Sequence, residues 1–201
     1  EMDAQYYLTN NKGERVHNTD SVGNSISVFL DRYAGKEPFC LSVSFKAPHE
    51  LDGNPATYPV QKKWKDLYAN SVIKEPVTAD PVYWNQFPSF FRNDQNIGRV
   101  RWLPLFSTPA LHAETVKNYY RLITGVDEVI GKMMDKLQTL GIKDNTVILL
   151  IGDNGFSLGE HGLQGKWYAY RESVRVPLIV YDPRASGNHN QTTEAIALNI
   201  D

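Results

Sequence analysis

An uninterrupted apolar run that stops abruptly at a polar loop constrains the fold of this chain more than any other feature. Residues 147–151 read VILLI, and the loop GDNG follows directly. A run rich in β-branched and aliphatic residues predicts a strand covered on both faces, as in the parallel sheets of α/β proteins. Asp153 and Asn154 then stand at the carboxyl end of that strand, which is where open α/β sheets bind their ligands.

Helical periodicity is clearest in the segment before this strand. Apolar residues recur at intervals of three and four over residues 114–140, and Gly141 provides a stop signal. A second helix is predicted over residues 20–33, with Asp20 or Ser21 as its N-cap. The long helix therefore leads into the strand and forms an α/β unit with it.

Two other apolar runs predict further strands. One covers residues 38–45 and ends at the sequence KAPH, and the other covers residues 178–181 after Pro177. Residues 50–112 contain most of the prolines and no sustained period, which indicates surface loops and short helices. We therefore predict an α/β fold with a mostly parallel central sheet flanked by helices.

Composition excludes several classes of function. The chain has 21 Lys plus Arg against 23 Asp plus Glu, so its net charge of -2 does not indicate a nucleic-acid-binding surface. No segment approaches the ~20 apolar residues of a membrane span. The single cysteine, Cys40, is interpreted as a buried free thiol inside an apolar strand. His112 and His189 lie in no motif and are expected at the surface.

Three segments carry a resemblance to a known family. In order they are PFCLSVSFKAPHE, then YYRLITGVDEVIGKMMDKLQTLG with the strand that ends in GDNG, and then GEHGLQGKW with ESVRVPLIVYDPR. Together they resemble the sulfatase family of the alkaline-phosphatase superfamily, over nearly the whole chain. The resemblance implies an alkaline-phosphatase-like fold, with residues 1–201 as an interior part of the catalytic domain and residues 50–112 as a loop-rich insertion.

Two elements of that family are absent from the sequence. Sulfatases carry, near the amino terminus, a pair of acidic metal ligands and a C/S-x-P/A-x-R signature that is oxidised to formylglycine. Cys40 has no proline or arginine at the required offsets. The resemblance therefore implies a fragment whose nucleophile and two further metal ligands come from an amino-terminal segment. We expect this chain alone to be inactive toward a sulfate ester.

The resemblance assigns a role to five residues. Asp153 and Asn154 match the late metal ligands of the family, and a carboxylate with an amide oxygen suits calcium or a similar divalent cation. Lys166 matches the lysine that contacts the sulfate, as a compact point charge. His49 matches the histidine that binds the sulfate or the leaving-group oxygen and can donate a proton. His161 is interpreted as contacting the substrate.

The same residue types have ordinary structural uses as well. Asp and Asn are common in turns for conformational reasons, and most lysines and strand-end histidines are simply solvated. The function implied is hydrolysis of a sulfuric ester, with sulfated carbohydrate as the substrate and an exported or lysosomal location (periplasmic, extracellular or lysosomal). Two alternatives stay open: a metal-dependent phosphoester or phosphonate hydrolase of the same superfamily, and a non-catalytic carbohydrate-binding relative.

Overall fold

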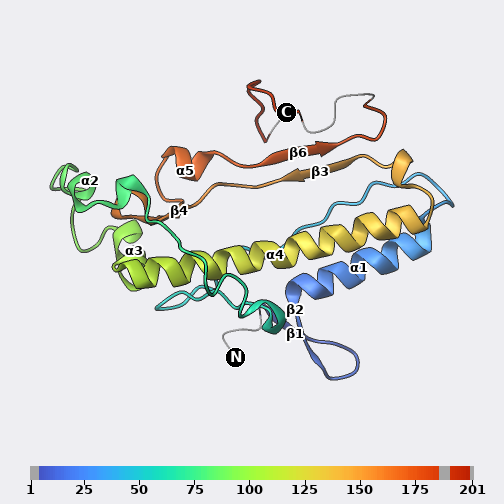
Figure 1. The fold of residues 1–201 in the computed structure, drawn as a ribbon, viewed down its shortest axis with the longest axis horizontal. Coiled ribbons are helices and arrows are strands. Elements are labelled where there is room, and N and C mark those ends of the chain that lie inside the picture. Colours follow the sequence, from blue (N-terminus) through green and yellow to red (C-terminus); the bar gives the residue numbers. More distant parts are fainter. Residues whose placement is uncertain (1–4, 186–190, 200–201) are drawn as a thin grey trace.

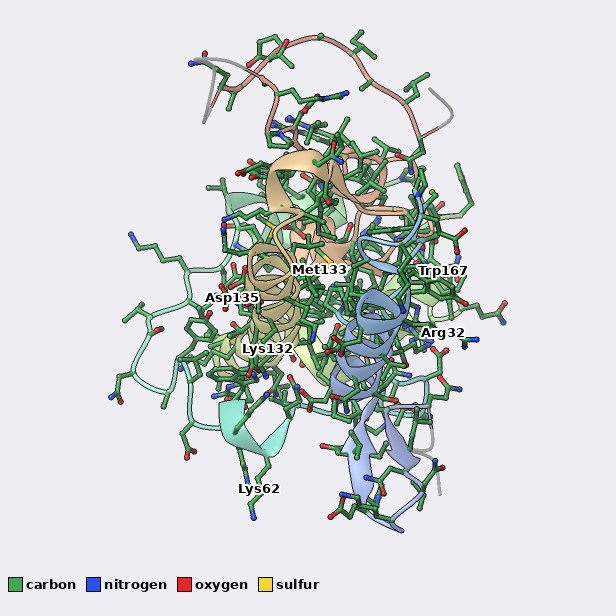
Figure 2. All side chains as sticks on the ribbon, turned by 90° about the vertical axis from the view of Figure 1, so that its right-hand side faces the viewer. Arg32, Lys62, Lys132, Met133, Asp135 and Trp167 are labelled. Carbon is green, nitrogen blue, oxygen red and sulfur yellow. The ribbon has the colours of Figure 1, made fainter. Side chains whose placement is uncertain are left out.

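Two helices that pack along each other form the centre of the computed structural model, which describes residues 5–185 and 191–199 (Figure 1). The longer one is α4 (Pro109–Thr139), and α1 (Asn18–Tyr33) lies beside its C-terminal half. Figure 2 views the pair end-on, with Met133 of α4 inside and Lys62 at the periphery. A buried cluster joins the two helices and consists of Ile26, Leu30, Val129 and Leu137.

The long helix begins earlier than its periodicity predicts. Pro109 occupies the first turn, and the Thr108 hydroxyl caps it by accepting from the Leu111 amide at 3.2 Å. At the other end Gly141 has a φ of 68°, so it stops the helix as predicted. The early start places His112 inside the helix, only 3% exposed, so the prediction of a surface position is wrong for this residue. His189 lies outside the described residues.

Helix α1 also begins earlier than predicted, and its N-cap is a different residue from the predicted ones. It begins at Asn18, and its N-cap is His17, not Asp20 or Ser21. The His17 Nδ1 accepts from the Thr19 amide at 3.2 Å, while its Nε2 lies 2.9 Å from the Pro59 carbonyl oxygen. This pattern requires a neutral ring that carries its proton on Nε2. Burial also lowers the pKa of His17, because the protonated ring loses the solvation that it would have in water.

Acidification is therefore expected to destabilise the chain through His17. The unfolded state binds the proton near the ordinary value of ~6.5 and the folded state resists it, so the free energy of unfolding falls as pH drops below that value. His17→Asn keeps a capping side chain and removes the titration. Urea unfolding at pH 7.5 and 5.5 should show a smaller loss for this variant than for the wild type. Equal losses in both proteins would contradict the assignment.

The strand before the GDNG loop exists but is not covered on both faces. β3 (Ile148–Ile151) pairs with β6 (Leu178–Tyr181). Ile148 packs on the helix pair, whereas Leu149 is 66% exposed, so the predicted two-sided burial is wrong for the described residues. The pairing is antiparallel, as in the other two sheets of the described residues, and does not match the predicted parallel arrangement. The reason is that residues 152–177 turn back at the end of β3 and do not cross over.

The predicted strand over residues 38–45 is extended but has no ladder partner among the described residues. It runs back along α4 on the side where β3 lies (Figure 1). Its alternate residues pack against the helix pair and are Phe39, Leu41, Val43 and Phe45. Cys40 lies on the opposite face and is exposed, which corrects its interpretation as a buried thiol. The period of two in this segment therefore buries one face only.

Most of the remaining elements lie around the first half of α4; the hairpin that precedes α1 lies at the start of that helix, and the 3₁₀ turn at Lys143–Asn145 follows the C-terminal end of α4 (Figure 1). The remaining elements are β1 (Tyr7–Thr9), β2 (Arg15–His17), α2 (Pro81–Asn85), α3 (Ile97–Phe106), β4 (Ser157–Leu158), β5 (Gln164–Gly165), α5 (Arg171–Val174), and short 3₁₀ turns at Lys62–Trp64, Val77–Ala79, Lys143–Asn145 and Glu160–Gly162. A second buried cluster includes Tyr6, Phe106 and Leu122, and it also contains Ala47 and Leu51 on either side of the His49 turn. That turn is consequently anchored in the core.

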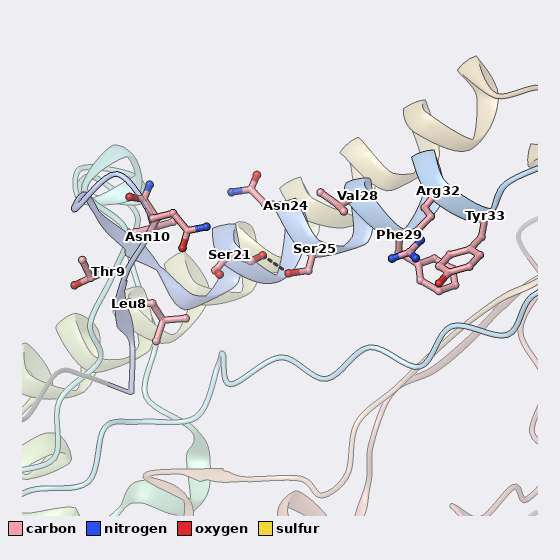
Figure 3. A pocket seen from close by; sticks show the side chains of 12 residues that line it. Leu8, Thr9, Asn10, Ser21, Asn24, Ser25, Val28, Phe29, Arg32 and Tyr33 are labelled. Atoms are coloured by element: carbon pink, nitrogen blue, oxygen red, sulfur yellow. Dashed lines mark hydrogen bonds between the residues drawn. The ribbon is translucent and has the colours of Figure 1, made fainter.

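A groove of about 600 Å³ lies between the first hairpin and the outer face of α1, lined by residues such as Leu8, Val28 and Tyr33 (Figure 3). None of the five predicted site residues lines it. Within residues 5–185 and 191–199, no helix combines the length and the apolar character needed to cross a bilayer.

Candidate functional site

The GDNG loop at the end of β3 is held by backbone hydrogen bonds to the segment that contains α5. The Gly152 amide donates to the Pro177 carbonyl at 3.2 Å, and the Gly155 amide donates to the Ser173 carbonyl at 2.9 Å. The Asn199 amide group also donates to the carbonyl of Asp153 at 3.0 Å. These bonds hold the backbone of the loop against the segment that contains α5.

Gly155 permits this close approach. A Cβ at this position would lie 2.1 Å from the Glu172 carbonyl oxygen and 2.6 Å from that of Arg175. Both contacts are with backbone atoms, which cannot rotate away as a side chain would. Glycine is therefore required for the loop to lie against α5 and to present the two residues before it.

The side chains of Asp153 and Asn154 are arranged by this loop. The Asp153 carboxylate is exposed and accepts from the Asn154 backbone amide at 2.9 Å. The Asn154 side-chain amide donates to the Gly155 carbonyl at 2.8 Å, which orients its oxygen Oδ1 away from the loop. One carboxylate and one amide oxygen are thus presented at the end of β3.

Lys166 reaches that amide oxygen from a different segment. Its Nζ lies 2.8 Å from Asn154 Oδ1. Lys166 follows β5, where Gly165 adopts a φ of 97° that favours glycine and turns the chain toward the GDNG loop. An ammonium has three donors, and the described contacts use one of them. The structure therefore joins the GDNG and GKW motifs at one place.

His49 lies in a tight turn in which the His49 amide donates to the Lys46 carbonyl at 3.0 Å. The His49 Nδ1 lies 2.6 Å from the Glu50 carbonyl oxygen. The Tyr6 hydroxyl donates to the backbone carbonyl of His49. A carbonyl partner fixes Nδ1 as the protonated nitrogen, so Nε2 is the acceptor in the neutral ring. No described hydrogen bond joins the imidazole directly to Lys166 or Asn154.

A buried carboxylate connects the His49 turn with the Lys166 loop instead. Glu50 is 3% exposed, and its Oε1 accepts from Gln164 Nε2 at 2.9 Å and from Arg101 at 2.7 Å. Its Oε2 accepts from the Tyr58 hydroxyl at 3.2 Å. Burial, and next the charge of Glu50, raise the pKa of Tyr58, so its hydroxyl keeps its proton and remains a donor.

His161 is held by aromatic and acidic neighbours. Its ring stacks on Tyr170 with centroids 4.6 Å apart and planes at 18°, and its Nε2 lies 3.9 Å from a carboxylate oxygen of Glu172. Tyr83 lies edge-on at 6.3 Å. The residue has a φ of 59°, an uncommon conformation for a side chain larger than glycine. Its described contacts include none of the other four predicted residues.

The oxygen donors present match part of a calcium site. Asp153 supplies a carboxylate and Asn154 supplies an amide oxygen, the ligand types that a hard divalent cation prefers. Calcium binds roughly six to eight oxygens. No group of three or more His, Cys, Asp or Glu side chains suited to a metal occurs in the described part of the chain. The donors therefore fit calcium in kind, as a portion of its coordination shell.

Residues in the network of Glu50 were missed by the sequence analysis. Gln164 lies inside the motif GLQGKW, and Arg101 lies in residues 50–112, outside the three segments that carry the resemblance. A glutamate directly after the KAPH turn was the available signal, because a charge at the end of an apolar run needs a partner if it is buried. Nothing in the sequence names that partner, since Gln164 is 114 residues away.

Comparison with known proteins finds sulfatases, both as a family model and as individual relatives. The family model described as Sulfatase matches residues 2–201. An arylsulfatase of Clostridium perfringens is 31% identical over 170 residues, which are 85% of this chain and 33% of that protein. An N-acetylglucosamine-6-O-sulfatase of Bacteroides thetaiotaomicron is 38% identical over 90 residues, 45% of this chain and 16% of that protein. The chain thus spans a third or less of the length of these two relatives.

Solved structures with a similar fold also exist. A protein in complex with its substrate D-glucosamine-2-N,6-O-disulfate has a TM-score of 0.63 and 23% identity, covering 86% of this chain and 44% of that one. A phosphonate monoester hydrolase from Silicibacter pomeroyi has a TM-score of 0.69 and 20% identity, covering 90% and 38%. At this level of identity the likeness concerns the fold, and it confirms the predicted alkaline-phosphatase-like α/β class.

Proposed function

This chain belongs to the sulfatase family, and on that basis we propose that it forms part of the sulfate-binding site of a sulfuric ester hydrolase that acts on sulfated carbohydrate. The single observation that carries the proposal is the bond of 2.8 Å between Lys166 Nζ and Asn154 Oδ1. It joins the ammonium group of the GKW motif to one of the two oxygen ligands in the GDNG motif. A metal and an anion held side by side need this combination.

Lys166 is proposed to bind the sulfate group directly. One of its three donors is used by Asn154, so two remain to contact oxygens of a tetrahedral anion. The ammonium is exposed, and the bond to Asn154 keeps it beside the proposed metal ligands. Lys166 would therefore neutralise charge on the non-bridging oxygens as the ester bond breaks.

His49 is proposed to donate a proton to the departing alcohol oxygen. The Glu50 carbonyl oxygen lies 2.6 Å from Nδ1, which leaves Nε2 for this transfer. An imidazolium is suited to the task because its Nε2 then carries a proton that can be transferred to the alcohol oxygen. His161 is proposed to contact the sugar, since Tyr170 and Glu172 hold its ring partly exposed at the surface of the loop.

Asp153 and Asn154 are proposed to hold a divalent cation, for which calcium is the best match in donor type. Such an ion would polarise the sulfate oxygens and stabilise their charge. A formylglycine has no matching position here, because Cys40 lies outside the required signature. We propose that the nucleophile and the other ligands lie outside residues 1–201, which cover 33% of the arylsulfatase relative.

One alternative is supported by a specific observation. The phosphonate monoester hydrolase shares the fold with a TM-score of 0.69, so this scaffold also accommodates phosphorus chemistry. Both kinds of ester present a tetrahedral anion to Lys166, and that residue does not distinguish them. Sulfate and methylphosphonate at equal ionic strength therefore serve as competing ligands in the experiment that follows.

Titration of the ¹⁵N-labelled chain with sodium sulfate tests the proposal. We expect saturable shifts at residues 153–155 and 164–166 and at the His49 imidazole, stronger with calcium present. Weaker shifts with methylphosphonate at the same residues would favour the sulfuric ester, and stronger ones would favour the phosphonate alternative. Sodium chloride at matched ionic strength is the control for screening. Shifts confined to another basic segment, such as residues 62–65, or the absence of saturation would overturn the proposal.

A further inference from the structure

We propose that Glu50 is a positioning residue that holds the His49 turn and the Lys166 loop in one fixed arrangement. The inference rests on the proposed function, because it concerns how the two proposed cations of that site are brought together. No described hydrogen bond joins His49 to Lys166. Their near neighbours in the sequence, Glu50 and Gln164, are hydrogen-bonded to each other. Glu50 follows His49 directly, and Gln164 precedes Lys166 by two positions.

The burial of Glu50 makes its contacts strong. Its side chain is 4% exposed, and a carboxylate removed from water is costly unless donors surround it. The three donors come from Arg101 of α3, Gln164 of β5, and Tyr58 in the loop that follows Glu50. The bonds from Arg101 and Gln164, at 2.7 and 2.9 Å, have the short lengths typical of a charged acceptor, whereas the bond from Tyr58 at 3.2 Å is longer. The carboxylate therefore ties three separate segments to the His49 turn.

Gln164 depends on Glu50 for its placement. Gln164 is 1% exposed, and its Oε1 has no hydrogen-bond partner in the described structure. Its Nε2 bond to Glu50 is therefore the polar contact that fixes this side chain. On the other side of the loop, Arg99 donates to the Gly162 carbonyl at 3.0 Å. The backbone that carries Lys166 is thus held from two sides.

A purely structural ion pair would not need this geometry. Arg101 already has a second partner in Asp52 at 2.9 Å, whose side chain is 63% exposed. Asp52 neutralises the same guanidinium but makes no described contact with Gln164. The feature that sets Glu50 apart is its bond to the Lys166 loop. This makes Asp52→Asn a matched control, since it alters the charge near Arg101 and leaves the link intact.

The variant that isolates the link is Gln164→Leu, which removes the loop's donor and retains the Glu50–Arg101 pair. We expect the sulfate Kd of this variant to rise roughly tenfold or more, the scale seen when residues that orient ligand-binding groups are removed. Amide exchange at residues 162–166 should accelerate by a similar factor relative to α4. Asp52→Asn should stay near wild type in both measurements, because it leaves the bond between Gln164 and Glu50 intact.

The outcomes separate the two proposals. If the wild-type chain binds sulfate and Gln164→Leu binds it equally well, the positioning role is wrong and the proposed function survives. A general loss of stability with unchanged sulfate affinity of the folded chain likewise overturns it, because that is the behaviour of a structural contact. If the wild-type chain does not bind sulfate, the proposed function fails and this inference fails with it.

Discussion

Replacement of Lys166 by alanine is expected to weaken sulfate binding by the chain roughly 10- to 100-fold. The estimate follows from the loss of a hydrogen bond to a charged group, worth about 1.5–3 kcal/mol. In the hydrolase that we propose, removing this donor from the transition state should reduce kcat/KM by roughly 10²–10³. Sulfate titration followed by NMR measures the first quantity, and hydrolysis of an aryl sulfate measures the second.

The exposure of Lys166 makes this a test of function rather than folding. Its described bond is the one to Asn154, and an exposed side chain contributes little to stability. The urea midpoint should therefore stay within about 0.5 kcal/mol of wild type. Lys74→Ala is the control, because Lys74 is also exposed and lies outside the motif. If Lys166→Ala binds sulfate as tightly as Lys74→Ala does, the assignment of Lys166 to sulfate binding is wrong.

Local sequence patterns predicted those parts of the fold that depend on local physics. The periodicity of α4, the stop at Gly141 and the bounds of β6 follow from residues near one another in the chain. Coverage of a strand depends on other segments instead. The run VILLI therefore predicted a strand correctly and its two-sided burial wrongly, and the same reason explains the exposure of Cys40.

In the candidate site, too, contacts between residues close in the sequence were predictable and contacts between distant residues were not. The meeting of Asn154 with Lys166 lies within one stretch of the chain, and the motifs were sufficient to suggest it. The contact between Glu50 and Gln164 crosses 114 residues, and no spacing or periodicity encodes it. Hydrogen bonds to a buried carboxylate are set by tertiary packing, so they become visible only when the fold is known.

Replacing Gly155 by alanine is expected to be the most damaging single change near the GDNG loop. The added methyl group would lie 2.1 Å from the Glu172 carbonyl oxygen, so the loop must move away from α5. The hydrogen bond from the Gly155 amide to Ser173 would be lost with that movement. Overpacking of this kind costs about 3 kcal/mol at the upper end of its usual range.

Gly155→Ala should also impair sulfate binding, in addition to lowering the free energy of unfolding. Asn154 directly precedes Gly155 and bonds to its carbonyl, so displacement of the loop carries Asn154 Oδ1 away from Lys166. We therefore expect Gly155→Ala to lose saturable sulfate shifts even under conditions where most molecules are folded, as judged by circular dichroism.

Gly131→Ala is the matched control for this prediction. Gly131 lies in α4 with open space around a new Cβ, so alanine there should stabilise the chain by about 0.5–1 kcal/mol. The same chemical change thus has opposite expected signs at two positions, because backbone crowds one site and solvent surrounds the other. If urea unfolding and sulfate titration give equal results for the two variants, the close approach of the GDNG loop to α5 is not what orders this site.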